Sequence, residues 1–185
     1  MSDTSSPLQP PLKDAKYDVV GLGNAIVDIL SHTEEKVIDD LGLRKGAMAL
    51  VDLERADTVL DKMGTTLMQS GGSGANTIAG IASFGGRCGY MGKVANDEFG
   101  EIFAHDMKAL KVDFISNNPE NENDLTARSH ILVTDDGERT MSTYLGVSTE
   151  FNPDDIDADM IKNAKLLYLE GYLFDKPKAH AAFEK

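Results

Sequence analysis

The sequence predicts an α/β protein built on an open parallel sheet that is flanked by helices. Short apolar segments that end in glycine or a polar residue alternate with longer segments of helical periodicity. The chain has 185 residues, of which 41% are hydrophobic and 26% charged, as in a globular domain. Strands that alternate with helices favour right-handed crossovers, and ligands of such sheets lie at the carboxyl ends of the strands.

The first elements are predicted from short apolar runs and the residues that end them. Tyr17 to Gly23 is typical of a buried strand that enters a turn, and residues 25–31 continue as a second extended segment. Val37, Ile38 and Leu41 have helical spacing, and the helix that they predict ends before Gly42. The next predicted elements are a strand over 47–51, a helix over 53–63 and a strand over 67–70.

The later elements follow from similar signals. Asp135-Asp136-Gly137 is typical of a hairpin turn between two extended segments. Asn152 and Pro153 fit the N-cap and the first position of a helix over 154–164. The other predicted helices cover 73–84, 97–110 and 177–185, and the other predicted strands cover 87–94, 113–115, 127–134, 138–144 and 166–171.

The number of extended segments exceeds what a simple alternation of strands and helices needs. The additional ones lie near 25–31, 47–51, 67–70 and 127–144. We therefore expect a parallel or mixed sheet flanked by helices, with a small second sheet over the ligand site.

Bulk properties exclude several classes of function. The net charge of -13 and the isoelectric point near 4.6 disfavour a nucleic-acid or anionic-membrane surface. Cys88 is the only cysteine, so no intrachain disulfide can form, which fits a reducing compartment. No segment approaches the roughly 20 apolar residues of a membrane span. We expect a cytoplasmic protein that binds neither nucleic acid nor membrane.

The N-terminal residues 1–16 are polar and rich in serine and proline, without the basic and then apolar pattern of a signal peptide. We expect a disordered leader, followed by one domain over 17–185.

Two glycine-rich segments carry most of the functional information. Gly71-Gly72-Ser73-Gly74-Ala75-Asn76 opens a predicted helix, where glycines admit a ligand to the backbone and the first N–H groups are free to donate. Asn76 can donate to and accept from a polyhydroxyl ligand. The second segment, Gly92 to Gly100, has the form Gly-x-Val-x-x-Asp-x-x-Gly and ends in a predicted helix.

Together, residues 71–100 resemble the first signature of the ribokinase-like (PfkB) carbohydrate and nucleoside kinases, and the resemblance extends over nearly all of 17–185. It implies the family's sheet with a β-sheet lid, and transfer of phosphate from ATP, with Mg²⁺, to a primary hydroxyl of a sugar or nucleoside. The segments that begin at Gly21 and Arg139 most resemble the adenosine-kinase-like bacterial members of the family. Adenosine is therefore the expected acceptor, and AMP the expected product.

The resemblance also indicates substrate-binding residues. Gly23 to Asp28 matches a family segment that holds sugar hydroxyls, and an aspartate at a strand end can accept two such hydrogen bonds. Ile26 stands where a dinucleotide-binding fingerprint has its third glycine, which weakens that alternative. The expected substrate-binding residues are Asn24, Asp28, Gly71, Gly72, Ser73, Asn76, Arg139 and Glu170; Arg139 could also be an exposed hairpin charge, and Glu170 an exposed strand end.

No catalytic residue is assigned within the chain. It contains neither a Gly-x-x-x-x-Gly-Lys-[Ser/Thr] loop nor the second family signature, which supplies the anion hole and the catalytic base in these enzymes. The four histidines lack metal-ligand spacing. Asp97 and Glu98 open a predicted helix, where carboxylates serve as caps. We expect the N-terminal part of a longer kinase, inactive by itself, with its base downstream.

Two alternatives and one partner remain open. A ribokinase or fructokinase specificity is compatible with the same motifs. A non-catalytic module that binds a sugar or nucleoside would also keep them. A homodimer that forms through the lid is a further expectation of the resemblance.

Overall fold

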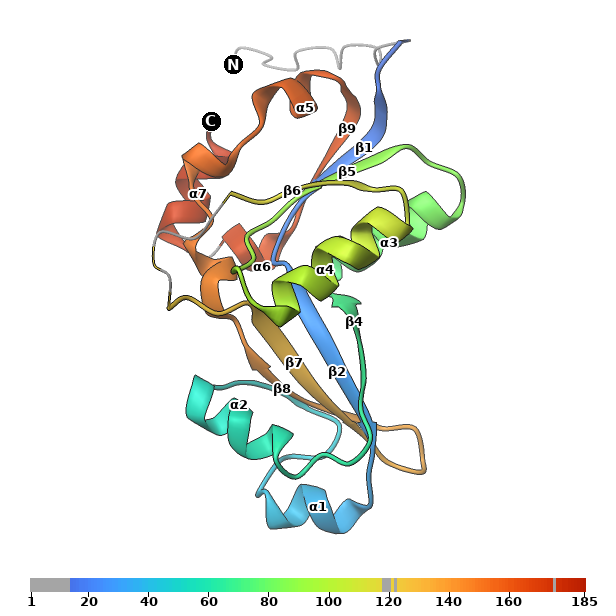
Figure 1. Cartoon of the computed structure of the whole chain (residues 1–185), viewed down its shortest axis with the longest axis vertical. Coiled ribbons are helices and arrows are strands. Elements are labelled where there is room, and N and C mark those ends of the chain that lie inside the picture. The colour runs from blue at the N-terminus through green and yellow to red at the C-terminus, as the bar shows by residue number, and fades with distance from the viewer. Residues whose placement is uncertain (1–13, 118–120, 122, 175) are drawn as a thin grey trace, which may run out of the picture.

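The computed structural model describes residues 14–117, 121, 123–174 and 176–185. Over these residues the strands form two sheets (Figure 1). One is a four-stranded sheet with the order β6-β5-β1-β9, all pairs parallel, and the other is a five-stranded mixed sheet with the order β3-β8-β7-β2-β4. We call them the parallel sheet and the five-stranded sheet. The parallel sheet consists of β1 (Tyr17–Leu22), β5 (Cys88–Met91), β6 (Asp113–Ile115) and β9 (Ala164–Leu169). The five-stranded sheet consists of β2 (Ile26–His32), β3 (Met48–Leu50), β4 (Leu67–Gly71), β7 (Ala127–Val133) and β8 (Arg139–Tyr144).

The helices of the described residues cover both faces of the parallel sheet (Figure 1). α3 packs on β1 and β5 on one face, where α4 contacts β6, and α5 contacts β1 and β9 on the other. The α-helices are α1 (Glu35–Asp40), α2 (Leu53–Leu60), α3 (Ser73–Ser83), α4 (Glu98–Ala109), α5 (Ala158–Lys162), α6 (Gly171–Phe174) and α7 (Pro177–Phe183), and the 3-10 turns are η1 (Gly146–Glu150) and η2 (Pro153–Asp155).

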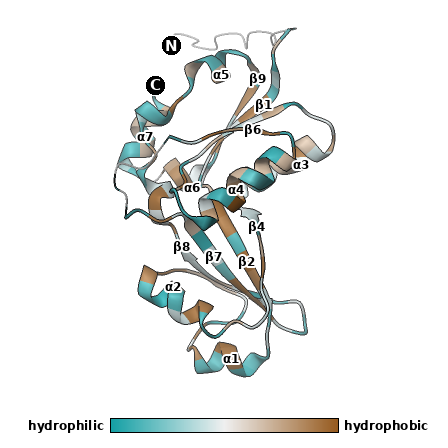
Figure 2. Ribbon diagram, viewed as in Figure 1, coloured by the Kyte–Doolittle hydropathy of each residue, from teal (hydrophilic) through white to brown (hydrophobic). Residues whose placement is uncertain are grey.

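The core lies on both sides of the parallel sheet because successive strand residues point to opposite faces. Val19 of β1 packs with Ile78 and Phe103 of α3 and α4, whereas its neighbour Val20 packs with Met160 of α5. The strands of this sheet are therefore mostly apolar, interrupted by Asp18, Asp113 and Lys165, and Figure 2 shows brown segments among paler and teal ones along them. The predicted α/β class with a parallel sheet is confirmed.

The five-stranded sheet continues from the parallel sheet where β1 passes directly into β2 (Figure 1). β2 pairs parallel with β7 and antiparallel with β4, and β7 and β8 form the predicted hairpin. α1 and α2 pack against one face through the buried Leu132. The predicted extended segments thus form one second sheet, which confirms that part of the predicted fold.

The predicted helix over 154–164 is wrong in its extent. Asn152 does cap a helical turn, in a reciprocal capping box with Asp155, but that turn is the short η2. Asp157 then adopts an extended backbone and caps a second helix, α5, by accepting from the N–H of Met160 at 2.8 Å. Two cap residues that lie five residues apart therefore divide the segment into two short helices.

Three further details differ from the sequence prediction. η1 and α6 were not predicted, and both are one-turn segments without apolar periodicity. Of the predicted leader, residues 1–13 lie outside the described residues. Its last residues are placed: Ala15 is buried, and the ammonium of Lys16 donates to Asp113 at 2.8 Å.

Among the described helices, none has the length and apolar character needed to cross a membrane.

Candidate functional site

The carboxylate of Glu170 joins three segments at the carboxyl ends of β1 and β9. Its Oε2 accepts from the backbone N–H of Asn24 at 2.6 Å and from Asn24 Nδ2 at 2.8 Å. Its Oε1 accepts from the N–H of Gly74 at 2.9 Å and from the hydroxyl of Ser73. Glu170 is 3% exposed. The alternative of an exposed strand-end residue is therefore wrong.

The side chain of Asn24 is held on both sides. Ser148 of η1 lies with its hydroxyl 3.0 Å from Asn24 Oδ1, and the hydroxyl of Tyr90 donates to the Asn24 carbonyl at 3.1 Å. Burial, with the Glu170 charge as a second cause, raises the pKa of the Tyr90 phenol well above its ordinary value. This phenol therefore remains a donor at neutral pH, and Asn24 has a fixed orientation.

The adjacent Gly71 and Gly72 are required by close packing within the protein. Gly72 has a φ of 91°, and a Cβ there would lie 2.6 Å from the carbonyl oxygen of Asn24. A Cβ on Gly71 would overlap the carboxyl group of Asp28. The sequence predicts that these glycines admit a ligand to the backbone. In the structure, their lack of a side chain allows β4 to approach the link between β1 and β2.

Asp28 lies in the middle of the five-stranded sheet, partly buried. In the described chain its carboxylate has no hydrogen-bond partner. Burial raises its pKa to about 6, and the positive charge of Arg139 opposes that rise. A carboxylate that is partly removed from water and left without donors is a site for ligand hydroxyls.

The neighbours of Asp28 across the sheet are polar. Asp28 is in register with Ser129 on β7, and Ser129 with Thr143 on β8, so the three side chains share one face. The hydroxyls of Ser129 and Thr143 lie 2.8 Å apart, in hydrogen-bond contact. Leu50 of β3 continues the row, and its side chain is 61% exposed. This row thus holds a partly buried carboxylate, two buried hydroxyls that bond to each other, and an exposed apolar side chain.

Asn76 projects from the N-terminal part of α3 and is exposed. Its own N–H is already bonded to the carbonyl of Gly72 at 2.9 Å, so only its side chain can serve a ligand. The N–H of Gly74, one of the free donors expected at this helix end, is bonded to Glu170. The anion at the N-terminus of α3 is thus the carboxylate of Glu170, a group of the protein itself.

The second half of the signature has a structural role. Asp97 caps α4 by accepting from the N–H of Gly100 at 2.8 Å, and it also accepts from the N–H and hydroxyl of Thr126 at 2.9 and 2.6 Å. One carboxylate therefore fixes both the start of α4 and the entry to β7. The cap predicted for Asp97 is confirmed, and Glu98 lies exposed in the first turn.

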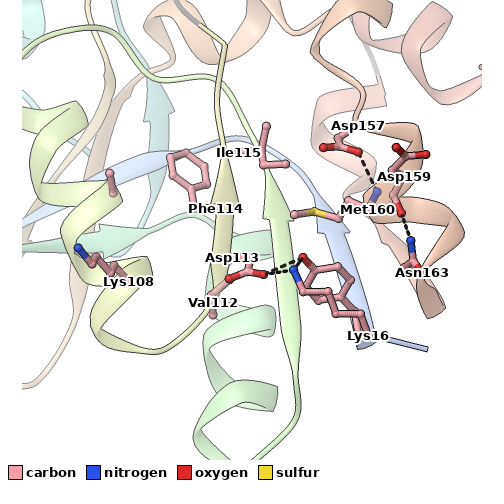
Figure 3. Close-up of a pocket in the computed structure, with 12 residues that line it drawn as sticks. Lys16, Lys108, Val112, Asp113, Phe114, Ile115, Asp157, Asp159, Met160 and Asn163 are labelled. Atoms are coloured by element: carbon pink, nitrogen blue, oxygen red, sulfur yellow. Dashed lines mark hydrogen bonds and ion pairs between the residues drawn. The ribbon is translucent and has the colours of Figure 1, made fainter. Parts of the chain in front are cut away.

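A further surface cavity lies elsewhere in the described chain. It has a volume of about 620 Å³ and opens near the starts of β1 and β6, between α4 and α5. Figure 3 shows Lys16 and Asp113 directed toward each other there, with Asp157 and Asp159 on the α5 side. Because ligands of open α/β sheets lie at the opposite, carboxyl ends of the strands, we assign the site to the cluster around Glu170 and Asp28.

The structure separates the predicted site residues into two sets. Asn24 and Ser73 are each bonded to Glu170, with Gly71 packed against Asp28 and Gly72 against Asn24. The side chains of Asp28, Asn76 and Arg139 make no hydrogen bond within the described chain, and they remain open to a ligand. Sequence reasoning missed Tyr90, Ser129, Thr143 and Ser148, because a hydroxyl in an apolar or mixed strand gives no signal until its partners are known.

Among the described residues, no group of three or more histidine, cysteine, aspartate or glutamate side chains is placed to hold a metal ion. We therefore assign no residue of this part of the chain to a metal.

Among solved structures the chain is similar to a probable sugar kinase protein from Rhizobium etli CFN 42, with 46% identity and a TM-score of 0.83, over 91% of this chain and 51% of that one. It is similar to adenosine kinase from Sinorhizobium meliloti, with 47% identity and a TM-score of 0.81 over the same shares. The chain thus spans about half the length of these relatives.

Curated kinases and a family model also match the chain. Probable fructokinase-2 of Arabidopsis thaliana is 28% identical over 136 residues, which are 69% of this chain and 41% of that protein. Residues 46–185 match the family described as pfkB family carbohydrate kinase, and this range includes residues 71–100 and Glu170. The chain therefore belongs to the pfkB family of carbohydrate kinases.

Proposed function

We propose that this chain binds the acceptor of an ATP-dependent kinase that phosphorylates a primary hydroxyl of a nucleoside, with adenosine as acceptor and AMP as product. The observation that carries the proposal is the carboxylate of Asp28. It is partly buried, its pKa is raised to about 6, and it has no hydrogen-bond partner in the described chain. Two vicinal hydroxyls of a ribose would supply the donors that it lacks.

The row beside Asp28 fits a nucleoside. Ser129 and Thr143, which are buried and bonded to each other, separate the Asp28 carboxylate from Leu50, whose exposed apolar side chain suits a base. The adenosine kinase of Sinorhizobium meliloti, at 47% identity, supports the same acceptor. Asp28, Asn76 and Arg139 are the residues that we assign to direct contact.

A fructokinase-type sugar kinase is the second candidate, favoured by the names of the curated relatives, which include the Arabidopsis thaliana fructokinases. A sugar would use the Asp28 carboxylate but leave the apolar end of the row without a partner. A comparison of adenosine with fructose and ribose therefore separates the two candidates.

The ATP and Mg²⁺ of the reaction are part of the proposal, and no described residue is assigned to either. A phosphoryl transferase needs donors directed at the γ-phosphoryl group and a base at the acceptor hydroxyl. Asp97, whose carboxylate opens α4, is engaged as a cap and by Thr126. We propose that residues 1–185 bind the acceptor and do not transfer phosphate.

The five-stranded sheet is proposed to act as a lid over the acceptor and as the surface through which two copies pair. Its open face carries Met48, Leu50 and Leu67, which are 53%, 61% and 61% exposed. Apolar side chains gathered on one face favour such a contact. Sedimentation of a Leu50→Lys variant, which keeps the fold but charges this face, tests the pairing.

The experiment that tests the function combines calorimetry and a coupled ADP-release assay on the 185-residue chain. We expect heat of binding with adenosine, weaker binding with ribose or fructose, and no acceptor-dependent ADP release. Tighter binding of fructose than of adenosine would transfer the assignment to a sugar kinase. ADP release that depends on the acceptor would show that the chain contains its catalytic base.

A further inference from the structure

Every hydrogen-bond acceptor position of the Glu170 carboxylate is occupied by the protein. A carboxylate has two oxygens and about four lone-pair sites. Asn24 provides two donors to Oε2, and Ser73 and Gly74 provide two donors to Oε1. A ligand hydroxyl could bind this carboxylate only by displacing one of them.

We propose that Glu170 is a positioning residue, which builds the acceptor site without touching the acceptor. The inference rests on the proposed function and leaves the direct contacts to Asp28, Asn76 and Arg139, whose side chains make no hydrogen bond in the described chain. Glu170 is 3% exposed, so displacement of one of its donors would leave a buried polar group unpaired.

The geometry shows what Glu170 positions. By accepting from both the backbone N–H and Nδ2 of Asn24, it fixes the turn that precedes β2 and the rotation of the amide. Ser148 donates to the amide oxygen of Asn24, and Glu170 accepts one hydrogen of Nδ2, so the second Nδ2 hydrogen has no partner in the described chain. The position of this turn determines where β2, the strand that carries Asp28, begins.

The same carboxylate fixes the helix that carries Asn76. Gly74 lies 96 residues from Glu170 in the sequence and donates to it from the first turn of α3. The negative charge lies at the positive end of that helix, where it is stabilising. Glu170 thus sets the distance between β2, which carries Asp28, and α3, which carries Asn76.

Glu170 also links this arrangement to an edge strand of the parallel sheet. Its N–H donates to the carbonyl of Leu22 at 2.9 Å, which continues the pairing of β1 with β9. β9 is one of the two edge strands of the parallel sheet in the described chain. A displacement of β9 would therefore be transmitted to Asn24 and to the start of α3 through one side chain.

The test compares Glu170→Gln with the matched control Glu101→Gln, at an exposed position of α4, in the 185-residue chain. An amide in place of the carboxylate turns one acceptor oxygen into a donor, so two of the four hydrogen bonds must fail. We expect amide hydrogen exchange of Asn24 or Gly74 to accelerate about tenfold or more without ligand, whereas the control stays unchanged.

The second measurement separates positioning from direct contact. Calorimetry is performed with adenosine and with its 2′-, 3′- and 5′-deoxy analogues. If Glu170 positions the site, Glu170→Gln weakens all four ligands by the same factor, about tenfold or more. If Glu170 accepts from one hydroxyl, the analogue that lacks this hydroxyl binds the variant and the unsubstituted chain equally, and the inference is overturned.

Two further outcomes are assigned in advance. Should Glu170→Gln not fold, Ser73→Ala, which removes a single donor, is expected to weaken all four ligands by one smaller factor; a loss confined to one analogue would contradict the inference. If the unsubstituted chain binds no nucleoside, the proposed substrate is wrong, and the comparison is repeated with ribose, fructose and their deoxy analogues. Unchanged exchange at both Asn24 and Gly74 overturns the positioning role in either case.

Discussion

Replacement of Asp28 by asparagine is expected to stabilise the ligand-free protein while it weakens acceptor binding. The substitution keeps the shape of the side chain and removes its charge. Asp28 is partly buried, its carboxyl group lies against Gly71, and within the described chain no donor compensates the lost hydration. Function and stability therefore make opposite demands on this position.

The magnitude follows from the pKa. Burial raises the pKa of the Asp28 carboxyl from its ordinary 3.8 to about 6, against the opposing charge of Arg139. One pKa unit corresponds to about 1.4 kcal/mol, so ionisation of Asp28 lowers the free energy of unfolding by up to about 3 kcal/mol. Because the pKa of Asp28 is raised in the folded state, its protonated form contributes stability that is complete below about pH 4 and is lost as the pH rises through about 6.

The assay is urea denaturation of the chain and of Asp28→Asn between pH 4 and pH 7.5, with the exposed Asp135→Asn as control. We expect the two proteins to approach each other in stability near pH 4, and the variant to exceed the unsubstituted chain by roughly 2–3 kcal/mol at pH 7.5. Calorimetry should show that Asp28→Asn loses about 2 kcal/mol or more of adenosine binding, and Asn76→Ala less. Equal stability at both pH values would refute the reasoning.

Three other predictions concern the rest of the molecule. Since Leu166 on the edge strand β9 is 64% exposed, the chain should self-associate in light scattering and Leu166→Lys should reduce this; a strictly monomeric unsubstituted chain would contradict it. If the five-stranded sheet closes over the acceptor, hydrogen exchange in 25–31, 47–51 and 127–144 should slow with saturating adenosine, and no change would count against a lid. His130 is fully buried with neither ring nitrogen bonded in the described chain, and burial, with the Arg128 charge, lowers its pKa, so it contributes stability above about pH 6.5 that is lost on acidification. His130→Leu should remove that part of the acid sensitivity in denaturation curves, and an identical pH profile would exclude His130 as its source.

The order of the elements was predictable because its signals are local. Tyr17 to Gly23 reads as a buried strand on its own, and Asp97 is recognisable as a helix cap from its neighbours. The glycine-rich start of α3 likewise indicated the site. The error at 154–164 has a local cause too, since a second cap at Asp157 competes with the first at Asn152.

The sequence by itself therefore determined the fold class, the family signature and the region of the site. Only the tertiary structure decided which site residues are free and which are bonded to the protein. Asn24 and Glu170 lie 146 residues apart, and no periodicity or motif connects an amide in one turn to a carboxylate after another strand. The burial of Asp28 and its register with Ser129 likewise arise from strand pairing, because desolvation depends on all the segments that pack around a group, not on its neighbours in the chain.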